Sequence, residues 1–211
     1  MNSSELKKLY GIRAEFVYLG APNNKSLPSN KVTNNQVTIL SVSRIVPYKG
    51  FHNLINIFNK LHIKYPNIKL TIIGSSPNHK YLNYLKSIAS KNVNFLINAS
   101  DKILTTNYQL ADIYATFDRY MFFGMPILEA ASFGIPSVAM NYAAAPEVVQ
   151  HAKTGFVTEN EKEFGEYLKK LIDSPLLRAK MGREAKKRSK GFSWEKTAQE
   201  YEKVFLRFGI K

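Results

Sequence analysis

Short apolar runs alternate along this chain with longer segments in which apolar residues recur every three or four positions. Runs of β-branched and aliphatic residues predict buried strands, and the three-to-four spacing predicts amphipathic helices. The strands are predicted at Glu15–Tyr18, Val37–Ser43, Lys69–Ile73, Val93–Ile97, Asp112–Ala115, Ser137–Met140 and Gly155–Val157. The helices are predicted at Phe51–Lys64, Lys80–Ser90, Leu104–Leu110, Pro126–Phe133 and Ala145–Gln150.

The last third of the chain lacks strand-like runs. From Glu161 onward the pattern predicts helices only, with breaks at Pro175 and Gly191. Strands that alternate with helices are typical of parallel βα units. The sequence therefore predicts an α/β fold, a doubly wound and mainly parallel sheet with a helical C-terminal segment, whose ligand lies at the strand carboxyl ends. We expect one domain over residues 1–211, in which residues 1–35 form an entry segment and a polar loop.

Composition excludes several classes of protein. A chain of 211 residues buries about 70% of its unfolded surface and needs no covalent staples. It contains no cysteine, which excludes disulfides, thiolate nucleophiles and cysteine-ligated zinc. No apolar stretch approaches the ~20 residues of a membrane span, and the N-terminus MNSSELKKLYG has no apolar signal core. We therefore expect a cytoplasmic protein, either free or peripheral at the cytosolic membrane face.

Positive charge is in excess. The chain carries 30 basic and 16 acidic residues, a formal net charge of +14, and much of the excess lies between Lys169 and Lys190. Such a segment is attracted to anionic membrane, nucleic acid or a phosphorylated substrate, or is a solvated helix face. No RNP pattern, GXXG clamp or zinc spacing accompanies it, so no specific nucleic-acid binding is predicted. The four histidines show no ligand spacing and no Asp-x-Asp motif occurs, so no metal site is predicted.

One continuous run, ADIYATFDRYMFFGMPILE from Ala111 to Glu129, joins a predicted strand to a predicted helix through a glycine turn. Pro126 stands in the first helical turn, where its missing N–H is tolerated. The amides at such a helix start bind phosphate, because they lack partners and the helix dipole is positive there. Glu129, one turn further in, can accept hydrogen bonds from vicinal hydroxyls such as those of a ribose. The run is therefore suited to a nucleotide.

Together with its continuation AASFGIPSVA, this run resembles the donor-binding domain of the GT-B glycosyltransferases, specifically the retaining family 4. The family pattern, A-D-hydrophobic strand-P-S-x-x-E-G-F-G-L-P-x-L-E-A-x-A-x-G-x-P-V-V-A, aligns with it without gaps. In the family two glutamates separated by seven residues contact the donor, the first at its sugar and the second at its ribose. Glu129 matches the second glutamate, whereas Met121 stands in the place of the first. Methionine accepts no strong hydrogen bond, so that contact is absent or supplied by another group.

A second motif, SRIVPYKG from Ser43 to Gly50, directly follows the strand-like run VTILSV. It is similar to the family's G-R-x-x-x-x-K-G, whose arginine and lysine hold the donor pyrophosphate. The resemblance implies that Arg44 and Lys49 stabilise the charge that builds on the leaving diphosphate. Taken alone, the motif is better described as two surface cations flanking a turn, since Lys and Arg are abundant in this chain.

Weaker matches follow in the family's order. Gly74 looks like the family's glycine turn near the nucleoside, and Ala99 ends a short loop that resembles the one contacting the base through its backbone. A glycine after a strand is also ordinary turn chemistry. The amides of Gly124, Met125 and Ile127 are candidates to donate hydrogen bonds to the diphosphate. Pro126 is not a candidate, because it has no N–H.

The resemblance also implies a reaction and its participants. It implies transfer of a glycosyl group, with retention of configuration, from a UDP-, GDP- or ADP-sugar, with no cofactor and no active-site metal ion. Residues 1–22 resemble the segment through which family members enter this domain, so we expect the N-terminal acceptor domain to be absent here and supplied by a partner chain, or the chain to act as a homo-oligomer. The run Phe192-Ser193-Trp194-Glu195 resembles the family's F-S-W-E, with Ser193 as a helix N-cap and Trp194 as a packing anchor.

Three functions are compatible with these patterns. The first is a glycosyltransferase donor domain. The second is a non-catalytic nucleotide-binding or interaction module derived from the same fold. The third is a nucleic-acid or membrane-surface binder that uses the basic C-terminal third, whose binding would be lost in moderate salt.

Overall fold

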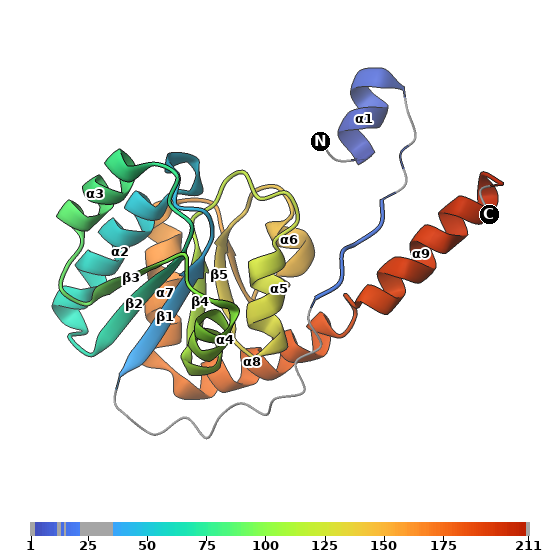
Figure 1. The fold of residues 1–211 in the computed structure, drawn as a ribbon. Coiled ribbons are helices and arrows are strands. Elements are labelled where there is room, and N and C mark those ends of the chain that lie inside the picture. Colours follow the sequence, from blue (N-terminus) through green and yellow to red (C-terminus); the bar gives the residue numbers. More distant parts are fainter. Residues whose placement is uncertain (1–2, 12–13, 15, 22–35, 210–211) are drawn as a thin grey trace.

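The computed structural model describes residues 3–11, 14, 16–21 and 36–209 (Figure 1). One sheet contains six strands: β1 Val37–Val42, β2 Ile68–Gly74, β3 Val93–Ile97, β4 Ile113–Thr116, β5 Ser137–Met140 and β6 Gly155–Thr158. The strand order is β3-β2-β1-β4-β5-β6, and every pairing is parallel. The predicted doubly wound α/β fold is therefore confirmed. The polar loop predicted at Asn23–Asn35 lies outside the described residues.

Nine helices are described: α1 Ser3–Tyr10, α2 Phe51–Lys64, α3 His79–Ile88, α4 Asp101–Leu110, α5 Met125–Ser132, α6 Ala145–Val148, α7 Glu161–Asp173, α8 Pro175–Ser189 and α9 Trp194–Arg207. The predicted breaks are confirmed, because Pro175 is the first residue of α8 and Gly191 lies between α8 and α9. Within the described part of the chain, no helix combines the length and the apolar character needed to cross a bilayer.

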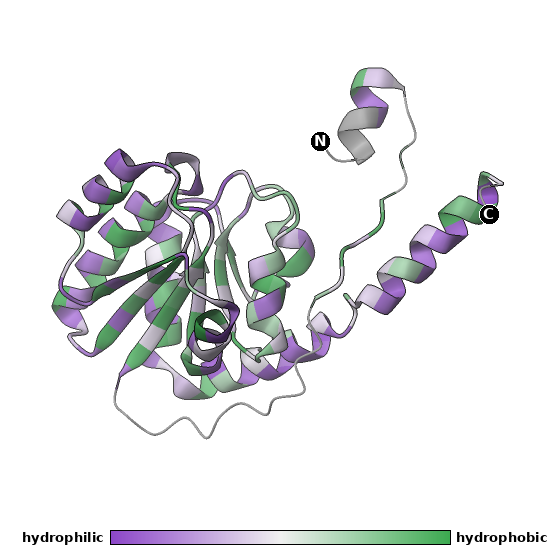
Figure 2. Cartoon of the chain, in the orientation of Figure 1, coloured by the Kyte–Doolittle hydropathy of each residue, from purple (hydrophilic) through white to green (hydrophobic). Residues whose placement is uncertain are grey.

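The side chains of successive strand residues pack into two separate hydrophobic cores, one on each face of the sheet. On β1, Ile39 packs with residues of α2, α3 and α7, whereas Leu40 packs with residues of α4, α5 and α6. On β4, Ile113 and Tyr114 divide in the same way. Because side chains alternate between faces along a strand, a strand covered on both sides is apolar at consecutive positions. Figure 2 shows hydrophobic stretches along the strands of the sheet and alternating hydrophobic and hydrophilic residues along the helices around it.

The strand predicted at Glu15–Tyr18 does not form. Residues 16–18 run as irregular chain outside the sheet, and residue 15 is not among the described residues. The Tyr18 ring packs edge-on against Phe192, with 5.5 Å between ring centroids, and the Tyr18 carbonyl accepts the Thr197 hydroxyl at 2.7 Å. The strand prediction is therefore wrong: this segment packs against the start of α9, and its Phe16 and Tyr18 side chains stay 64% and 38% exposed.

Helix α9 projects from the body of the molecule (Figure 1). Ser193 caps it as predicted, because its Oγ accepts the Lys196 amide at 3.2 Å. Trp194, predicted as a packing anchor, is 52% exposed although Gly20 lies directly against its backbone and ring, and Thr197 is the buried residue of α9. The large exposed apolar side chains of α9 and the turn after it are Trp194, Tyr201, Phe205, Leu206 and Phe208.

Candidate nucleotide site

The two predicted motifs meet at the carboxyl ends of neighbouring strands. Arg44 and Lys49 follow β1, and Gly124 follows β4. These two strands lie side by side, and the order of strands reverses between them. In doubly wound sheets ligands bind at this point of reversal, because the connections from the two strands run to opposite faces. The fold thus brings residues that are distant in sequence to the expected ligand position.

The loop after β1 has a shape that requires glycine at its end. Pro47–Lys49 form a 3₁₀ turn, and Gly50 follows with φ of +69°. A Cβ on Gly50 would lie 2.7 Å from the carbonyl oxygen of Phe117, in the loop after β4. Both the left-handed backbone and this close approach favour glycine. As a result the turn sits directly against the β4 loop, with Lys49 between them.

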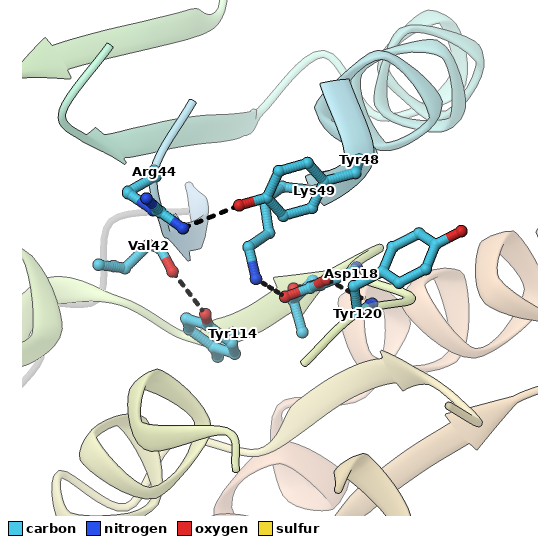
Figure 3. A network of polar contacts seen from close by, with 8 residues as sticks. Val42, Arg44, Tyr48, Lys49, Tyr114, Asp118 and Tyr120 are labelled. Atoms are coloured by element: carbon cyan, nitrogen blue, oxygen red, sulfur yellow. Dashed lines mark hydrogen bonds and ion pairs between the residues drawn. The ribbon is translucent and has the colours of Figure 1, made fainter. Parts of the chain in front are cut away.

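Polar contacts join the two loops into one cluster (Figure 3). The Lys49 ammonium lies 2.5 Å from Oδ2 of Asp118, and the two side chains are 12% and 5% exposed. The other oxygen of Asp118 accepts the Tyr120 amide at 2.8 Å. Arg44 donates to the Tyr48 hydroxyl at 2.8 Å, and the Tyr48 ring meets the Tyr120 ring edge-on with 6.1 Å between centroids. Arg44 and Lys49 are therefore held at one edge by the same small network.

Two helices start at this edge, and α2 has its first amides occupied. The amides of Asn53 and Leu54 both donate to the Gly50 carbonyl at 3.1 Å. The His52 amide donates to the hydroxyl of Tyr81, on α3, at 3.4 Å. A helix start with its N–H groups taken is a poor phosphate site.

Helix α5 differs at its start. Among the described residues no acceptor is found for the amides of Gly124 and Met125, and Pro126 has no N–H. The Ile127 amide donates to the Gly124 carbonyl at 2.9 Å, because the first turn of the helix closes there. Ile127 is thus not the open donor that the sequence predicted. The open amides at this edge are those of Gly124 and Met125.

Glu129 is held by a tyrosine from α4. The Tyr108 hydroxyl donates to Oε2 of Glu129 at 2.7 Å, and the Tyr108 ring, 2% exposed, stacks on Phe133. Burial first, and then the neighbouring Tyr114 and Glu129, raise the pKa of the Tyr108 phenol well above its ordinary value. The phenol therefore stays protonated at neutral and mildly alkaline pH and keeps donating. Its hydrogen bond fixes one carboxylate oxygen of Glu129.

Met121 packs into the core and offers no side chain to this edge. It is 6% exposed and shares a cluster with Ile127 and Val148. Its neighbours Tyr120 and Phe122 are 65% and 95% exposed. The Met121 side chain, which stands in the place of the family's first glutamate, is thus buried. It cannot supply the contact with the donor sugar that this glutamate makes in the family.

Gly124 is expected to tolerate no side chain. Its φ is +91°, and an added Cβ would lie 2.8 Å from the Met121 sulfur. We expect Gly124→Ala to lower the free energy of unfolding by about 2 kcal/mol, from the left-handed backbone and the crowding together. Gly209→Ala is the matched control, because Gly209 also has positive φ but nothing within 4 Å of the added atom. Urea denaturation of both variants checks this, and an equal loss in both would contradict a role for the Met121 contact.

The two weaker matches lie at the ends of β2 and β3. The backbone at Ser43 passes very close to Gly74. A Cβ on Gly74 would overlap the carbonyl oxygen of Ser43. The Gly74 carbonyl in turn accepts the Asn98 amide at 3.2 Å. Ala99 packs against the core on the α4 side of the sheet. Gly74 therefore has a packing reason to be glycine, and its contact with a nucleoside stays a prediction, as does that of Ala99.

Sequence reasoning missed two residues of this edge. Asp118 could have been found, since it is the only acid between residues 117 and 123 and follows the strand next to the one that precedes Lys49. Tyr108 carried no signal, because a tyrosine inside a helical pattern normally indicates core packing.

A doubly wound sheet with cations, open helix amides and a fixed carboxylate at its reversal point is typical of α/β domains that bind nucleotides. The family model for Glycosyl transferases group 1 matches residues 23–188. The chain belongs to this family of glycosyltransferases.

Relatives of known sequence agree with this. An uncharacterized glycosyltransferase of Haemophilus influenzae is 31% identical over 187 residues, covering 86% of this chain and 52% of that protein. A GDP-mannose-dependent monoacylated alpha-(1-6)-phosphatidylinositol monomannoside mannosyltransferase of Corynebacterium glutamicum is 32% identical over 186 residues, covering 82% of this chain and 49% of that protein. The chain thus spans about half the length of these relatives.

Solved structures share the fold. A glycosyltransferase from Rickettsia africae superposes with a TM-score of 0.84 at 20% identity, over 97% of this chain and 60% of that one. Anabaena HepE, in complex with UDP and glucose, gives a TM-score of 0.73 at 22% identity, over 82% of this chain and 48% of that one. At these identities the likeness shows the fold alone, which is that of one half of a GT-B enzyme.

Proposed function

We propose that this chain is the donor-binding domain of a retaining, family 4 glycosyltransferase that uses a nucleoside diphosphate sugar. The observation that carries the proposal is the convergence at one sheet edge of Arg44, Lys49, the open amides of α5 and Glu129. Cations and amides are suited to a diphosphate, and a fixed carboxylate to vicinal ribose hydroxyls. Membership of the glycosyltransferase family supports the same assignment.

The comparisons support the class of donor without fixing its base. The Corynebacterium relative is described as GDP-mannose-dependent, and the Anabaena structure holds UDP and glucose. UDP-, GDP- and ADP-sugars share a ribose and a diphosphate, which are the parts that the proposed site addresses. All three donors are therefore tested below.

In the proposed reaction the bond between the anomeric carbon and the diphosphate oxygen breaks, and its electron pair passes to the diphosphate. The acceptor oxygen bonds to the anomeric carbon on the same face, which retains configuration, and its proton passes to the departing diphosphate. Arg44 and Lys49 act on the negative charge that grows on the leaving group, so they stabilise the transition state more than the bound donor.

We further propose that an acceptor domain, on the same polypeptide or a partner, covers the apolar side of α9. Relatives are about twice as long as this chain, and α9 exposes Trp194, Tyr201 and Phe205 although it projects from the body. Exposed apolar side chains gathered on one helix are typical of an interface. The GT-B site is a cleft between two domains, so catalysis would need that second domain.

Contact with anionic membrane is a separate part of the proposal. Helix α8 exposes Lys180, Arg183 and Lys187, its C-cap Lys190 is exposed as well, and the Corynebacterium relative is named for a phosphatidylinositol monomannoside. Clustered basic side chains bind anionic lipid surfaces through electrostatics that salt screens. Co-sedimentation with phosphatidylglycerol vesicles at low and high salt tests this contact.

Calorimetric titration with UDP, GDP and ADP, and then with the matching nucleotide sugars, tests the donor site. We expect one diphosphate to bind, and Glu129→Ala to weaken it. A non-catalytic module would bind a nucleotide without distinguishing its sugar. If none of the three diphosphates binds at millimolar concentration, the proposed function is wrong for this chain.

Tyr108→Phe is expected to reduce recognition of the ribose. The change removes one oxygen, so Oε2 of Glu129 loses the hydrogen bond that orients it. Because hydrogen bonds to charged groups contribute about 1.5–3 kcal/mol, we expect roughly a tenfold loss of affinity for the ribose diphosphate. The 2′-deoxyribose analogue should lose much less. The two dissociation constants measured on each protein check this, and an equal loss for both nucleotides would mean that Tyr108 acts only through stability.

A further inference from the structure

The site contains a buried ion pair that diphosphate binding does not explain. Lys49 and Asp118 lie 2.5 Å apart at side-chain exposures of 12% and 5%. The Lys169–Asp173 pair of α7, at 2.6 Å, is 45% and 41% exposed and lies in solvent. A buried pair is screened by solvent and salt less than a surface pair, so Lys49 and Asp118 interact strongly with each other and with any charge placed beside them.

Asp118 is buried, and both its carboxylate oxygens and its amide have hydrogen-bonding partners. Its Oδ1 accepts the Tyr120 amide at 2.8 Å, its own amide lies 3.4 Å from the Thr116 hydroxyl, and the whole residue is 4% exposed. In the family pattern a serine stands where this chain has Asp118. The carboxylate is therefore an addition to the site, held rigidly beside the cation expected to meet the diphosphate.

The addition changes the charge that a ligand meets. Arg44 and Lys49 supply two positive charges, and Asp118 and Glu129 supply two negative charges, so the formal charges of these four residues cancel. Arg44 has a neutral partner, the Tyr48 hydroxyl, whereas Lys49 has a charged one. A diphosphate approaching Lys49 thus also approaches the Asp118 carboxylate.

We propose that Asp118 is a determinant of donor affinity that acts through Lys49, as an internal counter-ion which the diphosphate has to share. The inference rests on the proposed function, since it assumes that Lys49 meets the diphosphate. An ammonium has three N–H donors, and one of them is directed at Asp118, so Lys49 can hold both anions. The two anions repel each other across it, which weakens diphosphate binding. Asp118 is therefore a positioning residue and touches no substrate.

The test compares Asp118→Asn and Asp118→Ser with wild type, using UDP, GDP and ADP and the three matching nucleosides in calorimetry. Removing the carboxylate removes the repulsion, so we expect the diphosphate that binds wild type to bind both variants about tenfold more tightly. The nucleosides carry no phosphate, and their affinities should not change. Asp173→Asn is the matched control, because it removes the acid of a similar but exposed pair and should leave both affinities unchanged.

Thermal unfolding with and without the diphosphate gives a second reading. Both Asp118 variants leave the Lys49 ammonium without its counter-ion, so they should melt lower when empty and gain more than wild type from the ligand. Unchanged or weaker diphosphate binding in folded Asp118 variants would overturn this inference and leave the proposed function standing. Binding of no diphosphate to wild type or variants would overturn the proposed function and this inference with it.

Discussion

Replacing Arg44 by alanine and Lys49 by methionine in one protein is expected to abolish measurable nucleoside diphosphate binding. Each side chain would contribute a charge-assisted hydrogen bond worth about 1.5–3 kcal/mol. Losing both would weaken binding roughly 10²- to 10⁴-fold. Calorimetric titration with UDP, GDP and ADP measures the effect, and the matching nucleosides should lose far less affinity, because they lack the diphosphate.

The control for this variant is Lys180→Ala with Arg183→Ala. Both residues lie exposed on α8. The control therefore also removes two positive charges, but at a place away from the sheet edge. If the basic C-terminal third held the ligand, the control would weaken binding as much as the site variant. Equal losses would favour non-specific electrostatics over the proposed site, and that binding would also disappear at moderate salt.

The fold could be predicted from the sequence because both of its signals are local. Consecutive apolar residues such as Ile39 and Leu40 indicate a strand covered on both faces, and each such strand is followed by a helical period. The pattern failed at Glu15–Tyr18, where the apolar side chains are in contact with the α9 region and no strand pairs with them. Apolar character alone does not say whether such a segment pairs in a sheet, packs against a helix or stays largely exposed.

The candidate site was predicted only in part. Residues within a local motif could be predicted, whereas their contacts with residues distant in the sequence could not. Arg44, Lys49, Gly124 and Glu129 stand in motifs that resemble those of the family, and the fold brings the loops that carry them to one edge. The partners of these residues come from other strands and helices. The ion pair of Lys49 and the hydrogen bond of Glu129 each depend on side-chain contacts that no spacing along the chain encodes.

The open amides show the same limit at a finer scale. Sequence reasoning treated all amides after the glycine turn as equivalent, apart from the proline. In the structure the Ile127 amide closes the first turn of α5 on Gly124, which leaves the amides of Gly124 and Met125. Whether a particular N–H is open depends on how the first turn of the helix winds, and a motif along the chain does not specify that winding.

Lys49→Met alone is expected to destabilise the fold. It leaves the Asp118 carboxylate, 5% exposed, without its cation while keeping most of the packing of the lysine stem. Loss of one member of a buried pair costs about 3–5 kcal/mol, because the remaining charge is uncompensated. Adding Asp118→Asn removes that charge, so the double variant should recover most of the lost stability. Urea denaturation at neutral pH measures all four proteins of the cycle.

This cycle also decides how the binding data are to be interpreted. If Lys49→Met with and without Asp118→Asn are equally stable, the pair is not coupled, and the charge on Asp118 is better solvated than its burial indicates. If the double variant is stable and still fails to bind a diphosphate, the loss of binding comes from Lys49 itself and not from unfolding. Asp118→Asn alone would then be the informative comparison, since it keeps the cation, removes the competing anion and should bind most tightly of the four.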